Sequence, residues 1–222
     1  MPTAGTSDSS NGNYVLNRRG YGTHQALADR VRPGSTILDV GCASGYFMKY
    51  LREIKDCDSI GIEVDTNAAC RAREADFTVI HGSAEQGLAA VADHQPFDHI
   101  IFGDVLEHMV DPLAVLTACR TLLSPNGTAL VSLPNVVSLR ARLKLLLGIW
   151  RYEDAGIFDR THLRFYSVTT GRELIAESGF RITHESFVGP LTFYGGRRFL
   201  PVTALRPGLL ANQMVFEARP AQ

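Results

Sequence analysis

The stretch Ile37-Leu38-Asp39-Val40-Gly41-Cys42-Ala43-Ser44-Gly45-Tyr46-Phe47 decides the fold. An apolar run ends in a glycine-containing turn, and the residues after the turn have helical character, so we expect a strand, a tight turn and a helix. In sheets built from such units, ligands bind at the carboxyl ends of the strands, where a turn without bulky side chains lets a ligand approach the backbone. The stretch therefore predicts a ligand-binding α/β domain.

The same alternation continues on both sides of this turn. Apolar runs predict strands at Thr36 to Val40, Ser59 to Val64, Thr78 to His81, Phe97 to Phe102 and Thr128 to Leu133. Helices are predicted at Gly45 to Lys55, at Asn67 to Ala75, from Ala84, and from Asp111-Pro112 to Leu123, with Ser124 to Gly127 as a turn. Strands joined through helices form right-handed crossovers, which predict a doubly wound, mostly parallel sheet.

The pattern changes after Pro134. An amphipathic stretch, Val136 to Trp150, and a polar loop, Arg151 to Arg164, precede a predicted helix at Val168 to Ser178 and a strand at Phe180 to Val188. The last strand is predicted at Gln213 to Ala218. No helix is expected between these two strands, so we expect them to pair antiparallel at one edge of a seven-stranded sheet.

Length and composition favour one cytoplasmic domain. The 222 residues suffice for one core, and a net charge of −1 disfavours a nucleic-acid partner. The four cysteines have no C-x-x-C spacing and indicate reduced thiols. Residues 1–13 are expected to be a disordered tail. The domain then spans 14–222, with an insertion at 134–165 and a long loop at 189–211.

The glycine pattern and Asp39 distinguish between the possible cofactors, whereas Glu63 suits both. A dinucleotide site would require glycines at 41, 43 and 46, where this chain has Gly41, Ala43 and Tyr46. Asp39 would repel a pyrophosphate but favours a cationic ligand. Glu63 ends the second strand, about 20 residues beyond the turn, where an acidic group accepts ribose hydroxyls. A solvated carboxylate at a strand end is the alternative for Glu63.

The chain resembles the class I S-adenosylmethionine-dependent methyltransferases from about Tyr21 to Ala218. The motifs that carry the resemblance are Leu38 to Gly45, Glu63, Gly82 to Glu85, Asp98 to His108 and Leu122 to Gly127. It implies S-adenosylmethionine as cofactor, with S-adenosylhomocysteine as product, bound by Asp39, Gly41, Cys42, Ala43, Gly45, Glu63, Val64, Ser83, Ala84, Glu85, Asp104, Val105 and Leu106. Two residues depart from the family pattern, namely Ala43 for a glycine and Ser83 for an adenine-binding aspartate.

Two histidines are candidates for the catalytic base. Methyl transfer to a hydroxyl requires removal of a proton, and a neutral imidazole suits that role near neutral pH. His162 is favoured, and the alternative is a loop histidine that orders a lid. His108 is the second candidate, and it could instead contact the cofactor or cap a helix. The other histidines are expected to be structural. Asp104, Glu107 and His108 form the compact acidic and histidine cluster of the sequence, but no metal is expected.

The acceptor is expected to be a small hydroxylated molecule. The stretches Asp159 to Ser167 and Arg206 to Leu210 resemble a bacterial subgroup associated with polysaccharide or secondary-metabolite pathways, and also quinone-pathway O-methyltransferases. We therefore expect O-methylation of a sugar, a lipid-linked acceptor or a secondary metabolite. N- or C-methylation remains open. A non-catalytic cofactor-binding protein and an NAD-dependent oxidoreductase are alternatives of other classes.

Residues 136–151 are expected to form a contact surface. Their apolar positions follow helical spacing and have arginines and lysines around them. A lid helix packed on the domain or against a partner in a homodimer is the favoured interpretation. Peripheral contact with a membrane is the alternative, because basic amphipathic helices lie at lipid interfaces.

Overall fold

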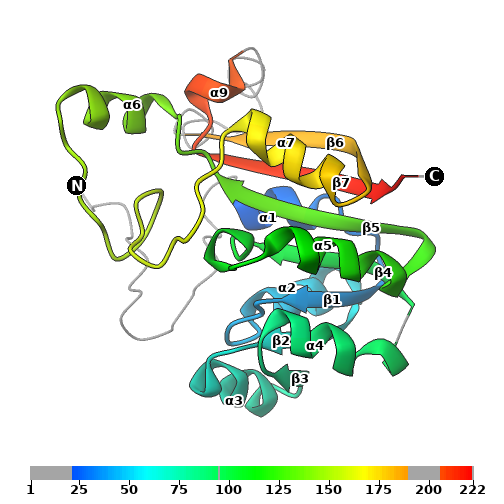
Figure 1. Ribbon diagram of the computed structural model, residues 1–222. Coiled ribbons are helices and arrows are strands. Elements are labelled where there is room, and N and C mark those ends of the chain that lie inside the picture. The colour runs from blue at the N-terminus through cyan, green and yellow to red at the C-terminus, as the bar shows by residue number, and fades with distance from the viewer. Residues whose placement is uncertain (1–21, 95, 190–205, 222) are drawn as a thin grey trace.

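The computed structural model describes residues 22–94, 96–189 and 206–221, and these form a seven-stranded sheet in the order β3-β2-β1-β4-β5-β7-β6 (Figure 1). The strands are β1 (Thr36–Val40), β2 (Asp58–Glu63), β3 (Thr78–His81), β4 (Phe97–Gly103), β5 (Leu123–Pro134), β6 (Phe180–Val188) and β7 (Gln213–Pro220). Strands β1 to β5 pair parallel, and β7 pairs antiparallel with both β5 and β6. The predicted fold class is confirmed.

Helices cover both faces of the sheet. The α-helices of the described residues are α1 (Thr23–Ala28), α2 (Tyr46–Lys55), α3 (Thr66–Glu74), α4 (Ala84–Ala90), α5 (Pro112–Cys119), α6 (Leu139–Leu146), α7 (Val168–Glu177) and α9 (Pro207–Leu210). Apolar residues of α4, α5 and α7 form one core cluster with the sheet, and these helices lie side by side in Figure 1. Residues of α1, α2 and α3 form two clusters on the other face. The sheet is therefore the middle of three layers.

Alternating side chains of β1 fill both layers. Leu38 and Val40 belong to the cluster under α4 and α5, whereas Ile37 belongs to the cluster under α1 and α2. This is the burial expected for a central parallel strand that has helices on both sides. Asp39 faces the same way as Ile37 and is the one acidic residue of the strand, so its burial needs a reason other than packing.

The predicted end of helix α5 and the predicted turn after it are wrong. The helix ends at Cys119, a 3-10 turn follows at Arg120–Leu122, and β5 already begins at Leu123. Leu123 pairs with Phe97 across an irregularity in the ladder, and the Ser124 hydroxyl donates to Asp98 Oδ1 at 3.2 Å. Because of these pairings, the Ser-Pro-Asn-Gly sequence, which was predicted as a turn, forms an irregular part of the strand.

The amphipathic stretch after β5 forms a shorter helix than predicted. Helix α6 begins after Ser138, whose hydroxyl accepts from Ala141 N, and ends at Leu146. Gly148 has a φ of 69°, a left-handed conformation that glycine adopts without strain and that terminates helices. The remainder of 136–150 is therefore not helical.

Strands β6 and β7 pair antiparallel as predicted, but two details differ. Strand β7 lies between β5 and β6, so β6 is the edge strand. The short helix α9 lies between them in sequence, where no helix was expected, because Pro207 has the fixed φ that suits a first helical turn. The predicted tail, 1–13, and most of the predicted loop, 189–211, lie outside the described residues.

Candidate functional site

The turn between β1 and α2 is held in left-handed backbone conformations. Gly41, Ala43 and Gly45 have φ values of 78°, 49° and 75°. Gly41 also lies against the segment that follows β4, because a Cβ atom at this position would come within 2.6 Å of Val105 Cγ2. Ala43 adopts a conformation that costs a residue with a side chain about 1–2 kcal/mol. The turn thus presents backbone at the carboxyl end of β1.

Glu63 joins this turn to the end of β2. Its Oε2 accepts from Ala43 N and its Oε1 accepts from Asp65 N, both at 2.8 Å. The carbonyl of Ile62 accepts from Gly41 N and from Cys42 N, at 2.8 and 3.1 Å. The structure therefore brings together the glycine turn and the carboxylate that the sequence singled out for the same site.

Asp39 is a buried carboxyl group beside this turn. It is 4% exposed, and burial, with the Glu63 charge as the smaller cause, raises the pKa of Asp39 to about 7. A carboxylate in such surroundings is stabilised by a nearby cation, which would lower its pKa again. The environment of Asp39 is consistent with a positively charged ligand and unfavourable for a phosphate.

The other predicted cofactor residues at β2 and β3 lie around the same edge. Ser83 caps α4 in a capping box with Gln86, so its hydroxyl accepts from Gln86 N at 3.3 Å. Ala84 and Glu85 form the first turn of α4 behind it. Val64 follows Glu63 and is 69% exposed. The hydroxyl of Ser83 therefore has a structural role in the position where the family often uses a carboxylate.

Asp104 directly follows β4, which lies on the opposite side of β1 from β2 and Glu63. It has a φ of 53°, its Oδ1 accepts from the Ser132 hydroxyl at 2.6 Å, and its Oδ2 accepts from Gln213 Nε2 at 3.4 Å. Burial raises the pKa of Asp104, opposed by the hydrogen bond from Ser132 and by nearby histidines. Its strained backbone is typical of functional sites.

Two predicted cofactor residues have side chains that point into the core. Leu106 is fully buried in the cluster under α4 and α5, and Cys42 is 2% exposed among residues of α2 and α3. Only their backbone atoms can therefore contact a ligand at the sheet edge. Both remain predicted cofactor residues in that restricted sense.

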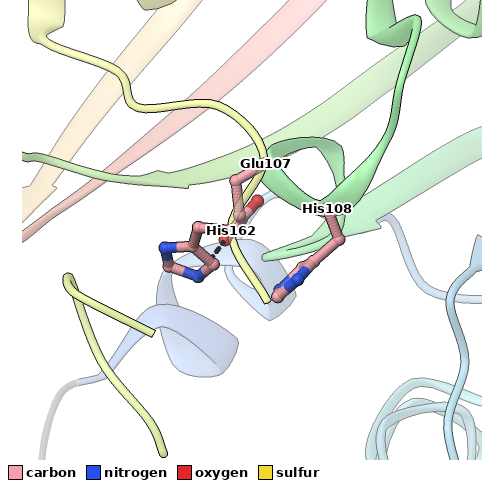
Figure 2. Close-up of side chains that lie close together, drawn as sticks. All are labelled: Glu107, His108 and His162. Carbon is pink, nitrogen blue, oxygen red and sulfur yellow. Dashed lines mark ion pairs between the residues drawn. The ribbon is translucent and has the colours of Figure 1, made fainter. Parts of the chain in front are cut away.

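A second group of polar side chains gathers beside Asp104, where Glu107 and His108 of the 3-10 turn η2 (Leu106–His108) meet His162 (Figure 2). His162 Nε2 lies 3.9 Å from Glu107 Oε1. The rings of His108 and His162 meet edge to face, with centroids 4.7 Å apart. Both predicted base candidates thus belong to one cluster, which we call the Glu107 cluster.

Backbone hydrogen bonds hold the segment of His162 in place. The carbonyl of Glu107 accepts from Leu163 N and Arg164 N, at 2.8 and 3.0 Å. His162 Nδ1 lies 3.3 Å from the Ile157 carbonyl, so in the neutral ring Nδ1 is the donor and Nε2 keeps its lone pair. Nε2 lies 3.9 Å from Glu107 Oε1, beyond hydrogen-bond distance, so its lone pair is available to accept a proton.

Burial controls the protonation of the Glu107 cluster. Glu107 is 1% exposed, and burial, followed by the Asp104 charge, raises the pKa of Glu107 well above its ordinary value. Burial, followed by the His108 charge, lowers the pKa of His162. Among the described residues, Glu107 Oε2 has no hydrogen-bond partner. A neutral Glu107 beside a neutral His162 is the arrangement that these surroundings favour at neutral pH.

The Glu107 cluster could also hold a metal ion. Glu107, His108 and His162 each offer one ligand atom, and these atoms lie within 4.8 Å of one another. One carboxylate and two imidazoles suit zinc or another transition metal better than magnesium, which prefers oxygen ligands. His162 replaces Asp104 in the cluster expected from sequence. The absence of a metal remains a prediction.

Comparison with protein families identifies the domain. The model of a methyltransferase domain matches residues 19–185, which is most of the chain. The chain belongs to this family of methyltransferase domains. The matched region runs from α1 to β6 and contains every residue of the glycine turn, Glu63, Asp104 and the Glu107 cluster. The resemblance inferred from the sequence motifs is confirmed.

The methyltransferase domain is similar to curated ubiquinone biosynthesis O-methyltransferases. It is 36% identical to that of Methylococcus capsulatus over 131 residues, 56% of this chain and 52% of the relative. It is 27% identical to that of Psychrobacter arcticus over 183 residues, 76% and 68% of the two chains. The match with the Methylococcus enzyme thus spans about half of that relative's length.

Solved structures support the fold of the methyltransferase domain. An S-adenosylmethionine-dependent methyltransferase from Archaeoglobus fulgidus matches with a TM-score of 0.60 and 19% identity, over 87% of this chain and 88% of that one. A possible histamine N-methyltransferase from Thermotoga maritima matches with a TM-score of 0.60 and 17% identity, over 89% and 86%. At these identities the likeness concerns the fold.

Sequence reasoning missed three polar residues of the methyltransferase domain. His24, expected to be structural, lies in α1 with its Nε2 2.7 Å from the Tyr46 hydroxyl, and it faces Asp104 closely enough to lower the pKa of that carboxyl. Ser132 and Gln213 contact Asp104 from β5 and β7. The feature of the sequence that could have identified Ser132 is its position near the carboxyl end of the strand beside β4. His24 and Gln213 had no such signal.

Proposed function

We propose that this protein is an S-adenosylmethionine-dependent methyltransferase that methylates a hydroxyl group of a small molecule. The buried Asp39 and the left-handed turn from Gly41 to Gly45 fit a ligand with positive charge that contacts backbone. Glu63 would accept the ribose hydroxyls, in exchange for its contacts with Ala43 N and Asp65 N. The family membership supports the same cofactor.

The observation that carries the proposal is the orientation of His162. Its Nδ1 is directed to the Ile157 carbonyl, which leaves the Nε2 lone pair free, and its lowered pKa keeps the ring neutral at neutral pH. S-adenosylmethionine supplies a methyl group on a positively charged sulfur that leaves as a thioether. With the cofactor bound, His162 Nε2 would take the proton of the acceptor hydroxyl, which makes that oxygen the nucleophile for methyl transfer.

Glu107 stabilises the product state of this step. Protonation of His162 places a positive charge 3.9 Å from Glu107 Oε1, in a buried site where Coulomb interactions are stronger than in water. The charged imidazolium favours ionisation of Glu107, whose proton then passes to solvent, so the pair ends as an imidazolium and a carboxylate. This gives the buried carboxyl a role in catalysis without direct contact with the acceptor.

The acceptor that we propose is a hydroxylated sugar, a lipid-linked acceptor or another secondary metabolite. The similarity to ubiquinone biosynthesis O-methyltransferases supports O-methylation and adds phenolic compounds to the acceptors to be screened. The segment 134–165, proposed to cover the acceptor, carries His162 and is attached to the domain through Glu107. Release of S-adenosylhomocysteine, measured across a panel of such compounds, would identify the acceptor.

Replacement of the proposed base tests the function. We expect His162→Ala to bind S-adenosylmethionine with unchanged affinity and to lose at least about a hundredfold in turnover, the usual contribution of a general base. Because the pKa of His162 is lowered, wild-type turnover should fall only below the ordinary histidine pKa of 6.5, and this acid limb should vanish in the variant.

The exposed His94 provides a matched control, since His94→Ala removes an imidazole from the 3-10 turn before β4. This control should retain full turnover and the same pH profile as the wild type. Unchanged turnover in His162→Ala would exclude His162 as the base, and His108→Ala would then test the second candidate.

A further inference from the structure

The exposed apolar side chains of this protein are concentrated in one segment. Eight of the fourteen large apolar residues that are exposed in the described part of the chain lie between residues 139 and 152: Leu139, Leu143, Leu145, Leu146, Leu147, Ile149, Trp150 and Tyr152. Leu146 and Leu147 are 81% and 73% exposed. We call the side chains of residues 139–152 the α6 surface. Contiguous apolar surface of this kind marks an interaction site.

The apolar stripe of α6 faces away from the domain. A helix turns by about 100° per residue, so Leu139, Leu143 and Leu146 fall within about 60° of one another. Ala141, the fully buried residue of α6, lies on the opposite side. The helix extends from the carboxyl end of β5, apart from the helices that cover the sheet (Figure 1). The leucines therefore do not serve the core of this domain.

Basic residues border this stripe. Arg140 and Arg142 lie about 90° to one side and about 70° to the other side of its centre by the same helical spacing. The sequence from Asn135 to Tyr152 contains four cations, Arg140, Arg142, Lys144 and Arg151, and no aspartate or glutamate. Lys144 is paired with Glu153, which leaves three arginines to give the surface its positive charge. A local charge of this sign contrasts with the net charge of −1 of the whole chain.

We propose that the α6 surface binds the surface of an anionic lipid bilayer. Leucines that enter the interface, with arginines whose stems lie along it and whose charges meet lipid phosphates, are the arrangement of interfacial helices. Trp150 and Tyr152 have rings in edge contact, with centroids 6.5 Å apart, and both residue types favour the level of the lipid headgroups. No helix in the described part of the chain is long and apolar enough to cross a membrane. The contact is therefore peripheral.

Charge favours a bilayer over a second copy of this chain. In a symmetric dimer each patch meets its own equivalent, so the arginines of one protomer would lie near those of the other. Like charges at an interface oppose association unless carboxylates separate them, and residues 135–152 provide none. An anionic bilayer offers both the apolar phase and the opposite charge that this surface needs.

Flotation with lipid vesicles tests the proposal. The full chain should float with vesicles of phosphatidylglycerol and phosphatidylcholine, and far less with phosphatidylcholine alone or at high salt, because salt screens the attraction. The double variant Leu146→Ser/Leu147→Ser should lose binding. The double variant Arg140→Gln/Arg151→Gln should lose about fivefold in partitioning for each arginine removed, and only on the anionic vesicles.

A matched control separates the α6 surface from general hydrophobicity. Ile54→Ser removes an apolar side chain that is 48% exposed on α2, and it should float like the wild type. Thermal unfolding verifies that the variants remain folded. Absence of flotation by the wild type, or flotation unchanged by the leucine variant, would refute the proposal. A dimer dissociated by that variant, without vesicle binding, would show instead that the α6 surface joins two copies.

Discussion

At the residue scale, Asp39 is a buried carboxyl group in the proposed cofactor site. Burial raises the pKa of Asp39 to about 7 from an ordinary value of 3.8, so the folded protein binds this proton more tightly than the unfolded chain does. The stabilisation is therefore complete below the ordinary pKa and is lost as the pH rises through the folded value. The shift of about 3 units corresponds to about 4 kcal/mol.

We predict that Asp39→Asn removes this pH dependence. Between about pH 5 and pH 8, the free energy of unfolding of the ligand-free wild type should fall by a few kcal/mol relative to that of the variant. Urea unfolding at the two pH values measures the difference. Asp58→Asn, a change at an exposed carboxylate in β2, should retain the wild-type profile. Parallel profiles for the wild type and Asp39→Asn would contradict the prediction.

The Glu107 cluster leads to a prediction about metal dependence. Burial favours a protonated Glu107, which is a poor metal ligand. We therefore expect turnover to remain unchanged after treatment with a chelator and on addition of magnesium or zinc. Loss of turnover with the chelator, restored by one of these metals, would assign the cluster to metal binding instead.

At the scale of elements, the β1 turn is the part that sequence predicted best. Strand β1 has the predicted bounds, and the alternation of strands and helices led to the parallel order from β3 to β5. Local patterns are sufficient here because the strands have apolar runs, the helices between them carry buried apolar residues, and the crossover has one favoured hand. The contact of Glu63 with Ala43 N then follows from the pairing of β1 with β2.

Contacts between distant segments could not be predicted in the same way. His162 and Glu107 were singled out separately, and what joins them is the pair of hydrogen bonds from Leu163 N and Arg164 N to the Glu107 carbonyl. Hydrogen bonds between backbone groups do not depend on side-chain identity, so the residue types do not indicate them. The insertion of β7 between β5 and β6 also depends on tertiary pairing between segments that are distant in sequence.

Two glycines with similar φ values lie at opposite ends of β1, and they allow the cost of backbone strain to be measured apart from the cost of steric contact. Gly41 and Gly34 have φ values of 78° and 70°, but a Cβ atom would lie 2.6 Å from Val105 Cγ2 at Gly41 and would meet nothing within 4 Å at Gly34. We predict that Gly34→Ala costs about 1–2 kcal/mol of stability from strain alone. Gly41→Ala should cost a further 1–3 kcal/mol, roughly the range for overpacking.

The two alanine variants should also differ in ligand binding. Displacement of Val105 alters the site between β1 and β4, whereas Gly34 lies at the opposite end of β1. Calorimetry should therefore find weakened binding of S-adenosylmethionine in Gly41→Ala and unchanged binding in Gly34→Ala. Equal unfolding free energies for the two variants would mean that Val105 yields at little cost.

At the scale of the whole molecule, the proposed cofactor site draws its residues from several strands of the sheet. Its residues come from the carboxyl ends of β1, β2 and β4, and Ser132 and Gln213 extend the hydrogen bonds of Asp104 to β5 and β7. A ligand bound at these ends contacts segments that are distant in sequence and that come together only in the folded state. Binding should therefore stabilise the whole domain rather than one element.

We predict that S-adenosylmethionine and S-adenosylhomocysteine raise the midpoint of thermal unfolding and that NAD does not. A ligand at about 100 times its dissociation constant stabilises the native state by about 2.7 kcal/mol, which corresponds to roughly 5–11 °C for a domain of this size. Both adenosyl ligands retain the ammonium group that Asp39 favours, whereas the pyrophosphate of NAD would meet the acidic pair Asp39 and Glu63. A shift with NAD, without one for either adenosyl ligand, would overturn the assignment of this site.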